Sequence, residues 1–198
     1  MSNISNSIMK KANNLPEGEV LSPKEFLHLG NRAAVDQAFS RLARQGKLFR
    51  VGWGLYARPV EGLYGERPPA VEKILGALAQ KTGESIVPSG ASSANKLGLT
   101  TQVPVQEVFL TSGKARNLNL GTRKVVLKRA PAWQTALGHR PAGLAVNALA
   151  WLGAEHAPKA MARLRKSLPA EERKALGTLC AEFPAWLAGI VGRLVRSA

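Results

Sequence analysis

Residues 18–59 have the sequence GEVLSPKEFLHLGNRAAVDQAFSRLARQGKLFRVGWGLYARP. A short apolar stretch, two helical stretches and two β-forming stretches follow one another there with almost no residues to spare. Ser22 stands directly before Pro23, and Glu25 follows at the third helical position. This pattern is typical of a helix start, because Ser caps free N–H groups, Pro suits the first turn and Glu can bond back to the cap. We therefore expect a first helix to begin at Pro23, with Phe26 on its apolar face.

A second helix is predicted over Arg32–Gln45. Gly30 tolerates a positive φ in the turn before it, and Asn31 can cap its first turn. Gly46 is a typical residue just past a helix end. Apolar residues recur at the spacing of one helical face, at Ala34, Val35, Ala38, Phe39 and Leu42.

Two β-forming stretches follow this helix, Leu48–Val51 and Leu55–Ala57, and Gly52-Trp53-Gly54 supplies the turn between them. A strand, two helices and a two-stranded ribbon in this order are typical of a winged helix-turn-helix. Such a module places its second helix in the DNA major groove. The sequence therefore predicts a DNA-binding domain over residues 1–60, braced by a further helix over residues 4–14.

The polar side of the second helix is the candidate DNA-reading face. Gln bonds adenine edges, Arg bonds guanine edges, and Ala can touch the thymine methyl group. Arginines near the helix end are as well placed for phosphates as for bases. Basic residues and a Trp at and beside the turn suit the DNA backbone or the minor groove. The predicted DNA-binding residues are Asn31, Arg32, Ala33, Asp36, Gln37, Ser40, Arg41, Arg44, Lys47, Arg50, Trp53 and Arg58.

A structural alternative stays open for this face. Polar faces of amphipathic helices usually only meet water, and Trp53 can pack on its own domain instead of on DNA.

The chain is strongly basic, with 28 Lys and Arg against 13 Asp and Glu in 198 residues and a net charge of +15. The excess is spread: it is +5 over residues 1–60, +6 over 61–140 and +4 over 141–198. A positive field of this kind favours nucleic acid or an acidic protein as partner. No uncharged apolar run of about 18 residues and no apolar signal-peptide core occur, so we expect a cytoplasmic protein without membrane partners.

The rest of the chain is expected to form a linker, a small mixed domain and a helical tail. Residues 61–69 (EGLYGERPP) are rich in Gly and Pro, which predicts the linker. The predicted fold class is α+β: an N-terminal winged helix-turn-helix (1–60), the linker (61–69), a small α/β domain (70–140) and a C-terminal helical region (141–198). The expected middle elements are a helix 69–83, a strand 85–88, a helix 89–98, a strand 105–110, a basic connection 114–121 and a strand 123–128.

The helical region is expected to consist of segments 143–153, 157–167, 169–181 and 184–196. Segment 157–167 carries a basic face, which either is solvated or contacts DNA or an acidic partner.

No pattern for catalysis or metal binding stands out. His28, His139 and His156 are far apart and form no ligand spacing, so no metal and no cofactor are expected. Ser112-Gly113-Lys114 resembles the end of a phosphate loop, but Val108 stands where its first Gly belongs. Residues 89–93 (SGASS) can cradle an anion or simply cap a helix. The single Cys180 cannot form a disulfide within the chain and is expected to be a small buried residue. We predict no catalytic residues and no enzyme activity.

The N-terminal half resembles the AbiEi family of antitoxins. The resemblance rests on Pro23–Phe26, Val35–Leu42, Gly46–Leu48 and above all Arg50–Pro59 (RVGWGLYARP), and further on residues 88–99 (PSGASSANKLGL). It covers residues 1 to about 130. It implies an N-terminal domain that binds double-stranded operator DNA, as inverted repeats, and represses its own operon. It also implies a C-terminal part that neutralises a nucleotidyltransferase toxin in a bacterial toxin–antitoxin or phage-defence system.

Two other classes of function stay open at this point. The winged domain can serve protein contact alone, with the basic tail gripping an acidic partner. The protein can also bind nucleic acid generally, RNA included, because positive charge does not choose between nucleic acids.

Overall fold

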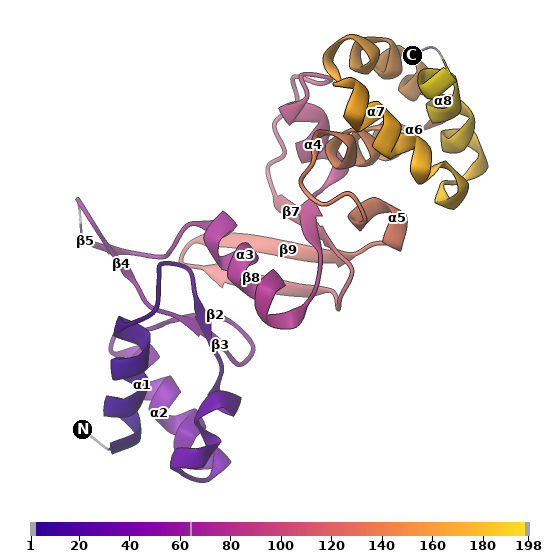
Figure 1. Cartoon of the computed structure of the whole chain (residues 1–198). Coiled ribbons are helices and arrows are strands. Elements are labelled where there is room, and N and C mark those ends of the chain that lie inside the picture. The colour runs from indigo at the N-terminus through magenta and orange to yellow at the C-terminus, as the bar shows by residue number, and fades with distance from the viewer. Residues whose placement is uncertain (1–2, 64, 197–198) are drawn as a thin grey trace. The chain divides into compact units, whose positions relative to one another are not determined.

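The computed structural model describes residues 3–63 and 65–196, and it divides into two compact units. Unit 1 comprises residues 1–84 and 117–125, and unit 2 comprises residues 85–116 and 126–198. Figure 1 labels most of the helices and strands of both units along the chain. The fold is a mixture of helices and several small sheets, so the predicted α+β class is confirmed.

The helices at the start of unit 1 are α1 (Asn3–Asn13), the 3₁₀ helix η1 (Pro23–Leu29) and α2 (Arg32–Arg44). Asn31 caps α2 as expected: its Oδ1 accepts a hydrogen bond of 2.8 Å from the Ala34 N–H. The helices share one apolar core, and Phe39 stands in it with its ring centroid 5.4 Å from that of Phe26 and 4.8 Å from that of Tyr56. The other buried residues of this core are Ile8, Ala12, Leu21, Val35, Ala38, Leu42 and Leu48.

A small antiparallel sheet completes this part, with β1 (Val20–Leu21), β2 (Phe49–Gly52) and β3 (Leu55–Ala57). The strand order is β1-β3-β2, and Ala57 pairs with Val20 on one side and Phe49 on the other. The expected sequence of strand, helix, helix and ribbon is therefore present, within a residue or two of its predicted bounds.

The Glu25 carboxylate ties three helices of unit 1 together. It accepts a 2.8 Å hydrogen bond from the Ser22 N–H, which is the predicted capping contact, and it pairs with Lys11 of α1 at 2.9 Å. It also bonds Lys81, whose Nζ reaches the Val20 carbonyl at 2.6 Å. Burial raises the pKa of Glu25, but the hydrogen bonds from Lys81, Lys11 and the Ser22 N–H outweigh it, so the pKa lies below its ordinary value.

The predicted linker 61–69 forms a β-hairpin instead. Strand β4 (Val60–Gly62) pairs with β5 (Gly65–Arg67), and Tyr64 lies outside the described residues. At least one of the glycines that suggested a linker is needed for the hairpin, because Gly65 adopts a φ of 105° beside the turn, a backbone that favours Gly. Helix α3 (Val71–Thr82) then follows and ends at Gly83, which has a left-handed backbone, as expected.

A second hairpin replaces the predicted connection 114–121. Strand β8 (Arg116–Leu120) alternates polar and buried residues and turns at Gly121, with φ 66°, into β9 (Arg123–Arg129). The alternation Asn117-Leu118-Asn119-Leu120 is a period-two strand signal that the Asn content obscured. The tip of this hairpin, residues 117–125, belongs to unit 1.

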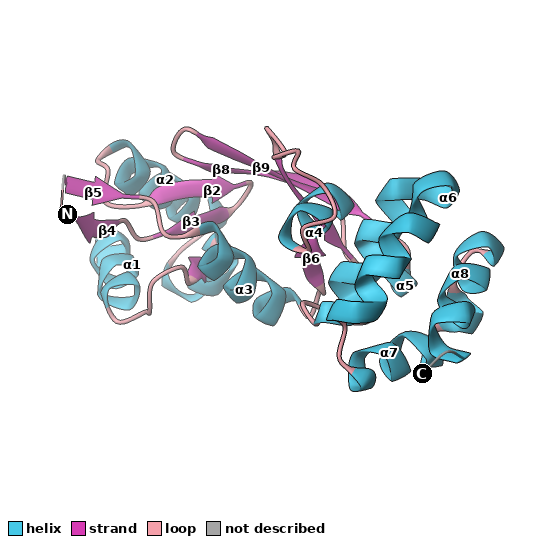
Figure 2. Ribbon diagram, turned by 90° about the horizontal axis from the view of Figure 1, so that it is seen from above, coloured by secondary structure: helices cyan, strands magenta, loops and turns pink. Residues whose placement is uncertain are grey.

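Unit 2 begins with β6 (Ile86–Pro88), α4 (Gly90–Lys96) and β7 (Glu107–Thr111). The sheet has the order β6-β7-β9-β8. The strand expected at 105–110 is shifted, since Val105 is fully exposed. Helix α4 packs closely on α6, as Figure 2 shows: a Cβ at Gly90 would lie 2.5 Å from the Asn147 carbonyl oxygen.

Helices form the remainder of unit 2, and the predicted helical tail is confirmed. They are α5 (Ala132–Thr135), α6 (Pro141–Ser167), α7 (Ala170–Thr178), η2 (Cys180–Glu182) and α8 (Ala185–Arg196). Gly153 interrupts α6 with φ 73° and ψ 174°, where two separate helices were expected. Cys180 is only half buried, contrary to expectation, because η2 lies at the edge of the apolar core.

The predicted middle domain 70–140 is not one of the two units. Helix α3 and the hairpin tip 117–125 cluster with the N-terminal elements, and the other residues cluster with the C-terminal helices. In the portion of the chain that is described, no helix is both long and apolar enough to cross a membrane.

Candidate nucleic-acid interface

The side of α2 that faces away from the core carries the predicted DNA-reading residues. Burial of Val35, Ala38, Phe39 and Leu42 orients the helix, so the intervening positions point outward. Arg32, Ala33, Gln37, Arg41 and Arg44 are exposed, whereas Asp36 and Ser40 are half buried.

Five of these residues line a shallow hollow of about 440 Å³ on the outward side of α2. The hollow offers donors and acceptors of several kinds: a carboxylate, an amide, a hydroxyl and two guanidinium groups. This mixture can pair with base edges as well as with phosphates. The lining residues are Asp36, Gln37, Ser40, Arg41 and Arg44.

Arg32 and Asp36 form an ion pair one helical turn apart, with the Arg32 Nε 2.8 Å from the Asp36 Oδ2. Both side chains are about half exposed, so the pair stabilises the helix by only about 0.3–0.5 kcal/mol. The ion pair has a larger effect on the local potential, because Arg32 offsets the negative charge of Asp36, which would otherwise repel phosphate. The pair leaves Gln37 and Arg41 as the better placed groups for direct base contact.

The turn between β2 and β3 projects an aromatic ring into solvent. Trp53 is 90% exposed, and Gly54 beside it has a φ of 62°, a backbone that favours Gly. The alternative that Trp53 packs on its own domain is therefore wrong. Arg50, in the strand that leads to the turn, is exposed as well.

Lys47 and Arg58, predicted to flank the ribbon, lie in different surroundings. They line a hollow of about 520 Å³ together with three carboxylates, Glu17, Glu61 and Glu66. Glu17 is already paired with Lys73 and Arg67, but Glu61 and Glu66 lower the positive potential there, so phosphate contact by Lys47 and Arg58 is weaker than their charge suggests. The structure thus divides the predicted DNA-binding residues into a group on α2 and the turn, and a group beside acids.

A segment far along the chain lies next to the β2–β3 turn. A Cβ at Gly52 would lie 3.2 Å from Leu118 Cδ2 and 3.7 Å from the Asn117 carbonyl oxygen. Sequence reasoning missed this neighbour. Its only sequence signal was the period-two alternation of β8.

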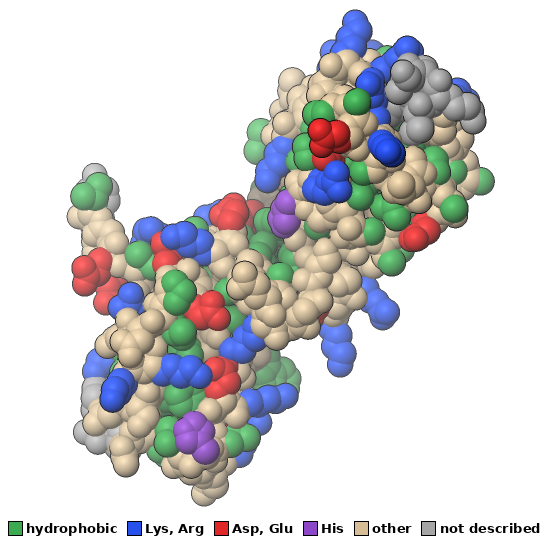
Figure 3. Space-filling view, viewed as in Figure 1, with side chains coloured by type: hydrophobic (Ala, Val, Ile, Leu, Met, Phe, Trp, Pro, Cys, Tyr) green, Lys and Arg blue, Asp and Glu red, His purple; other side chains and the backbone are tan. Residues whose placement is uncertain are grey.

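Unit 2 is more basic than the unit that contains α2. It has 14 Lys and Arg against 5 Asp and Glu, compared with 14 against 8 in unit 1. Figure 3 shows basic side chains on both units in this view. The positive charge is therefore not concentrated on the predicted DNA-binding module.

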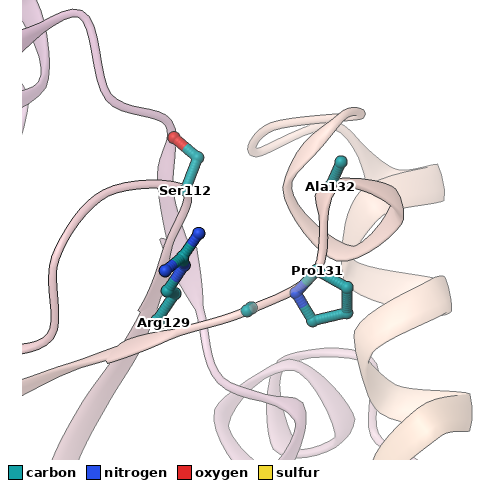
Figure 4. Close-up of a pocket in the computed structure, with 5 residues that line it drawn as sticks. Ser112, Arg129, Pro131 and Ala132 are labelled. Atoms are coloured by element: carbon teal, nitrogen blue, oxygen red, sulfur yellow. The ribbon is translucent and has the colours of Figure 1, made fainter.

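A hollow of about 450 Å³ in unit 2 is lined by Ser112, Arg129, Ala130, Pro131 and Ala132, of which Figure 4 labels four. Its hydroxyl group, on Ser112, accepts a 2.9 Å hydrogen bond from the Ser85 N–H, and none of the lining residues can act as its base. No cluster of three His, Cys, Asp or Glu side chains able to hold a metal occurs among the described residues.

Comparison with known proteins assigns the chain to a family. The sequence matches DUF6088, described as a family of unknown function, over residues 7–176, and the chain belongs to this family. The fold is similar to that in the crystal structure of the RV2827C protein from Mycobacterium tuberculosis, with a TM-score of 0.53 and 17% sequence identity. That similarity covers 100% of this chain and 78% of that chain. A search of curated proteins found no match.

Proposed function

We propose that residues 1–60 form a winged helix-turn-helix that binds double-stranded DNA and that the protein represses its own operon. The observation that carries the proposal is the outward side of α2, where amide, hydroxyl and guanidinium groups surround one hollow. The exposed Trp53 on the β2–β3 turn supports it, since this turn then has the position of a wing.

In this proposal α2 lies in the major groove. Gln37 reads adenine and Arg41 reads guanine, each through two hydrogen bonds to a base edge. Arg44, nearer the end of the helix, contacts phosphate, and Arg50 and Trp53 contact the backbone or a groove edge. Arg32 contributes to DNA binding while it remains in its ion pair with Asp36.

The test is binding of the full-length protein to its own upstream promoter DNA and to a scrambled duplex, at near-physiological salt. We expect tighter binding to the promoter, and we expect the double variant Gln37→Ala/Arg41→Ala to remove that preference while weakening nonspecific binding far less. Lys174→Ala, an exposed residue of α7 in unit 2, is the control for lost positive charge. An equal loss on both duplexes would refute base readout by α2.

Salt dependence gives a second measure. If about six phosphates are neutralised, the logarithm of affinity falls with the logarithm of salt concentration at a slope near −5. An affinity that does not change with salt would contradict nucleic-acid binding altogether.

We further propose an antitoxin role, as the resemblance to AbiEi implies, with a nucleotidyltransferase toxin as target. Unit 2 has 14 basic and 5 acidic residues, and this excess of positive charge suits an acidic protein partner. Co-expression with the product of the neighbouring gene tests this role. We expect that product to arrest growth alone and not together with this protein; growth arrest that persists would exclude antitoxin action against it.

A further inference from the structure

The tip of the β8–β9 hairpin lies against the strand that leads into the β2–β3 turn. Gly52 has no side chain, and a Cβ there would lie 3.2 Å from Leu118 Cδ2. A contact this tight means that the hairpin fits against the backbone of β2 itself. Trp53 is the next residue along the chain, so the hairpin tip lies beside the β2–β3 turn.

The hairpin is anchored by its inward face and leaves its outward face free of the core. The side chains of Leu118, Leu120 and Val125 are buried and at most 2% exposed. Asn117, Asn119 and Lys124 alternate with them and are exposed. The backbone that carries these exposed side chains is thus held in place before a ligand arrives, which lowers the entropy lost on binding.

The far end of the hairpin is also held in unit 1. Gly121, with φ 66°, makes the tight turn into β9, and a Cβ there would lie 3.0 Å from Pro68 Cγ. Pro68 belongs to the segment between β5 and α3. The tip is therefore fixed at both ends, by Leu118 against Gly52, 66 residues away in sequence, and by Gly121 against Pro68, 53 residues away.

We propose that the hairpin tip 117–125 is a second DNA-contacting element beside the β2–β3 turn, with the phosphate backbone of double-stranded DNA as its ligand. Lys124 neutralises a phosphate, and the amide groups of Asn117 and Asn119 donate hydrogen bonds to phosphate oxygens. This inference rests on the proposed DNA binding by α2. Phosphate contacts set position and affinity and carry no base information, so the tip lengthens the contacted DNA without changing the preferred sequence.

The test compares Lys124→Gln and Lys124→Gln/Asn119→Ala with the wild-type protein, on promoter and scrambled duplexes over a range of salt. For each variant, we expect the affinity to fall by the same factor on the promoter duplex as on the scrambled duplex. We expect the salt slope to become shallower by about 0.9 for the lost phosphate contact. Lys174→Gln, which removes the same charge from unit 2, is the matched control and should leave the slope unchanged.

Two outcomes would overturn the inference in distinguishable ways. If Lys124→Gln behaves as Lys174→Gln does while the wild type still prefers its promoter, the tip does not touch DNA and the proposed function stands. If the wild type shows no salt-dependent binding to either duplex, the proposed function fails and the inference fails with it. Because all substituted side chains are exposed, circular dichroism and thermal unfolding should be unchanged, which excludes misfolding as the cause.

Discussion

Gly90→Ala tests the contact between α4 and α6 that organises unit 2. The added Cβ would lie 2.3 Å from Trp151 Cβ and 2.5 Å from the Asn147 carbonyl oxygen. Ordinary contacts begin at 3.4 Å, and neither of these atoms can rotate away, so the helices must separate by roughly 1 Å. Overpacking of this kind costs about 1–3 kcal/mol of unfolding free energy. In a chain of this length, each kcal/mol lowers the melting temperature by about 2–4 °C.

Gly76→Ala is the matched control for this substitution. Gly76 is also helical, in α3, but it is exposed and a Cβ there would meet nothing within 4 Å. It should stabilise the protein by about 0.5–1 kcal/mol, because Ala loses less backbone entropy than Gly in a helix. Urea unfolding followed by far-ultraviolet circular dichroism measures both. If Gly90→Ala is neutral or stabilising like Gly76→Ala, the described close approach of α4 to α6 is wrong.

Two further predictions concern unit 1. Asn31→Ala removes the cap of α2 and should cost about 1 kcal/mol of unfolding free energy, whereas Asn31→Ser should retain most of the stability; equal losses in urea titrations would exclude a capping role. Glu25 has a folded-state pKa below its ordinary 4.5, so its bonds to Lys81 and Lys11 stabilise the fold above that pH and are lost as the pH falls through the lowered pKa. The stability difference between wild type and Glu25→Gln should accordingly be constant near neutral pH and shrink in acid, and a difference independent of pH would contradict this account.

The N-terminal elements could be predicted from the sequence because their signals are local. Glu25 and Asn31 accept hydrogen bonds from N–H groups within three residues of themselves, as the sequence predicted. The apolar spacing in α2 also identified its buried side, and hence the outward positions of Gln37 and Arg41. Local hydrogen bonding and helical period need no knowledge of the rest of the chain.

The sequence did not predict the two hairpins, because the composition of these regions is typical of loops whereas their residues pair as β-strands. Residues 61–69 have the composition of a linker, and residues 114–121 that of a polar connection, yet both regions pair with a neighbouring strand. A short strand is stable only when a partner completes its hydrogen bonds, and local residue preferences do not reveal that partner.

By itself, the sequence determined the helices of unit 1, their caps and the residues that α2 turns outward. Only the tertiary structure decided which of these residues share a surface. It grouped Asp36, Gln37, Ser40, Arg41 and Arg44 around one hollow and set Lys47 and Arg58 beside acids. It also brought Leu118 against Gly52, a contact across 66 residues. Such contacts follow from burying apolar surface between segments distant in the chain, and no local pattern encodes which segments meet.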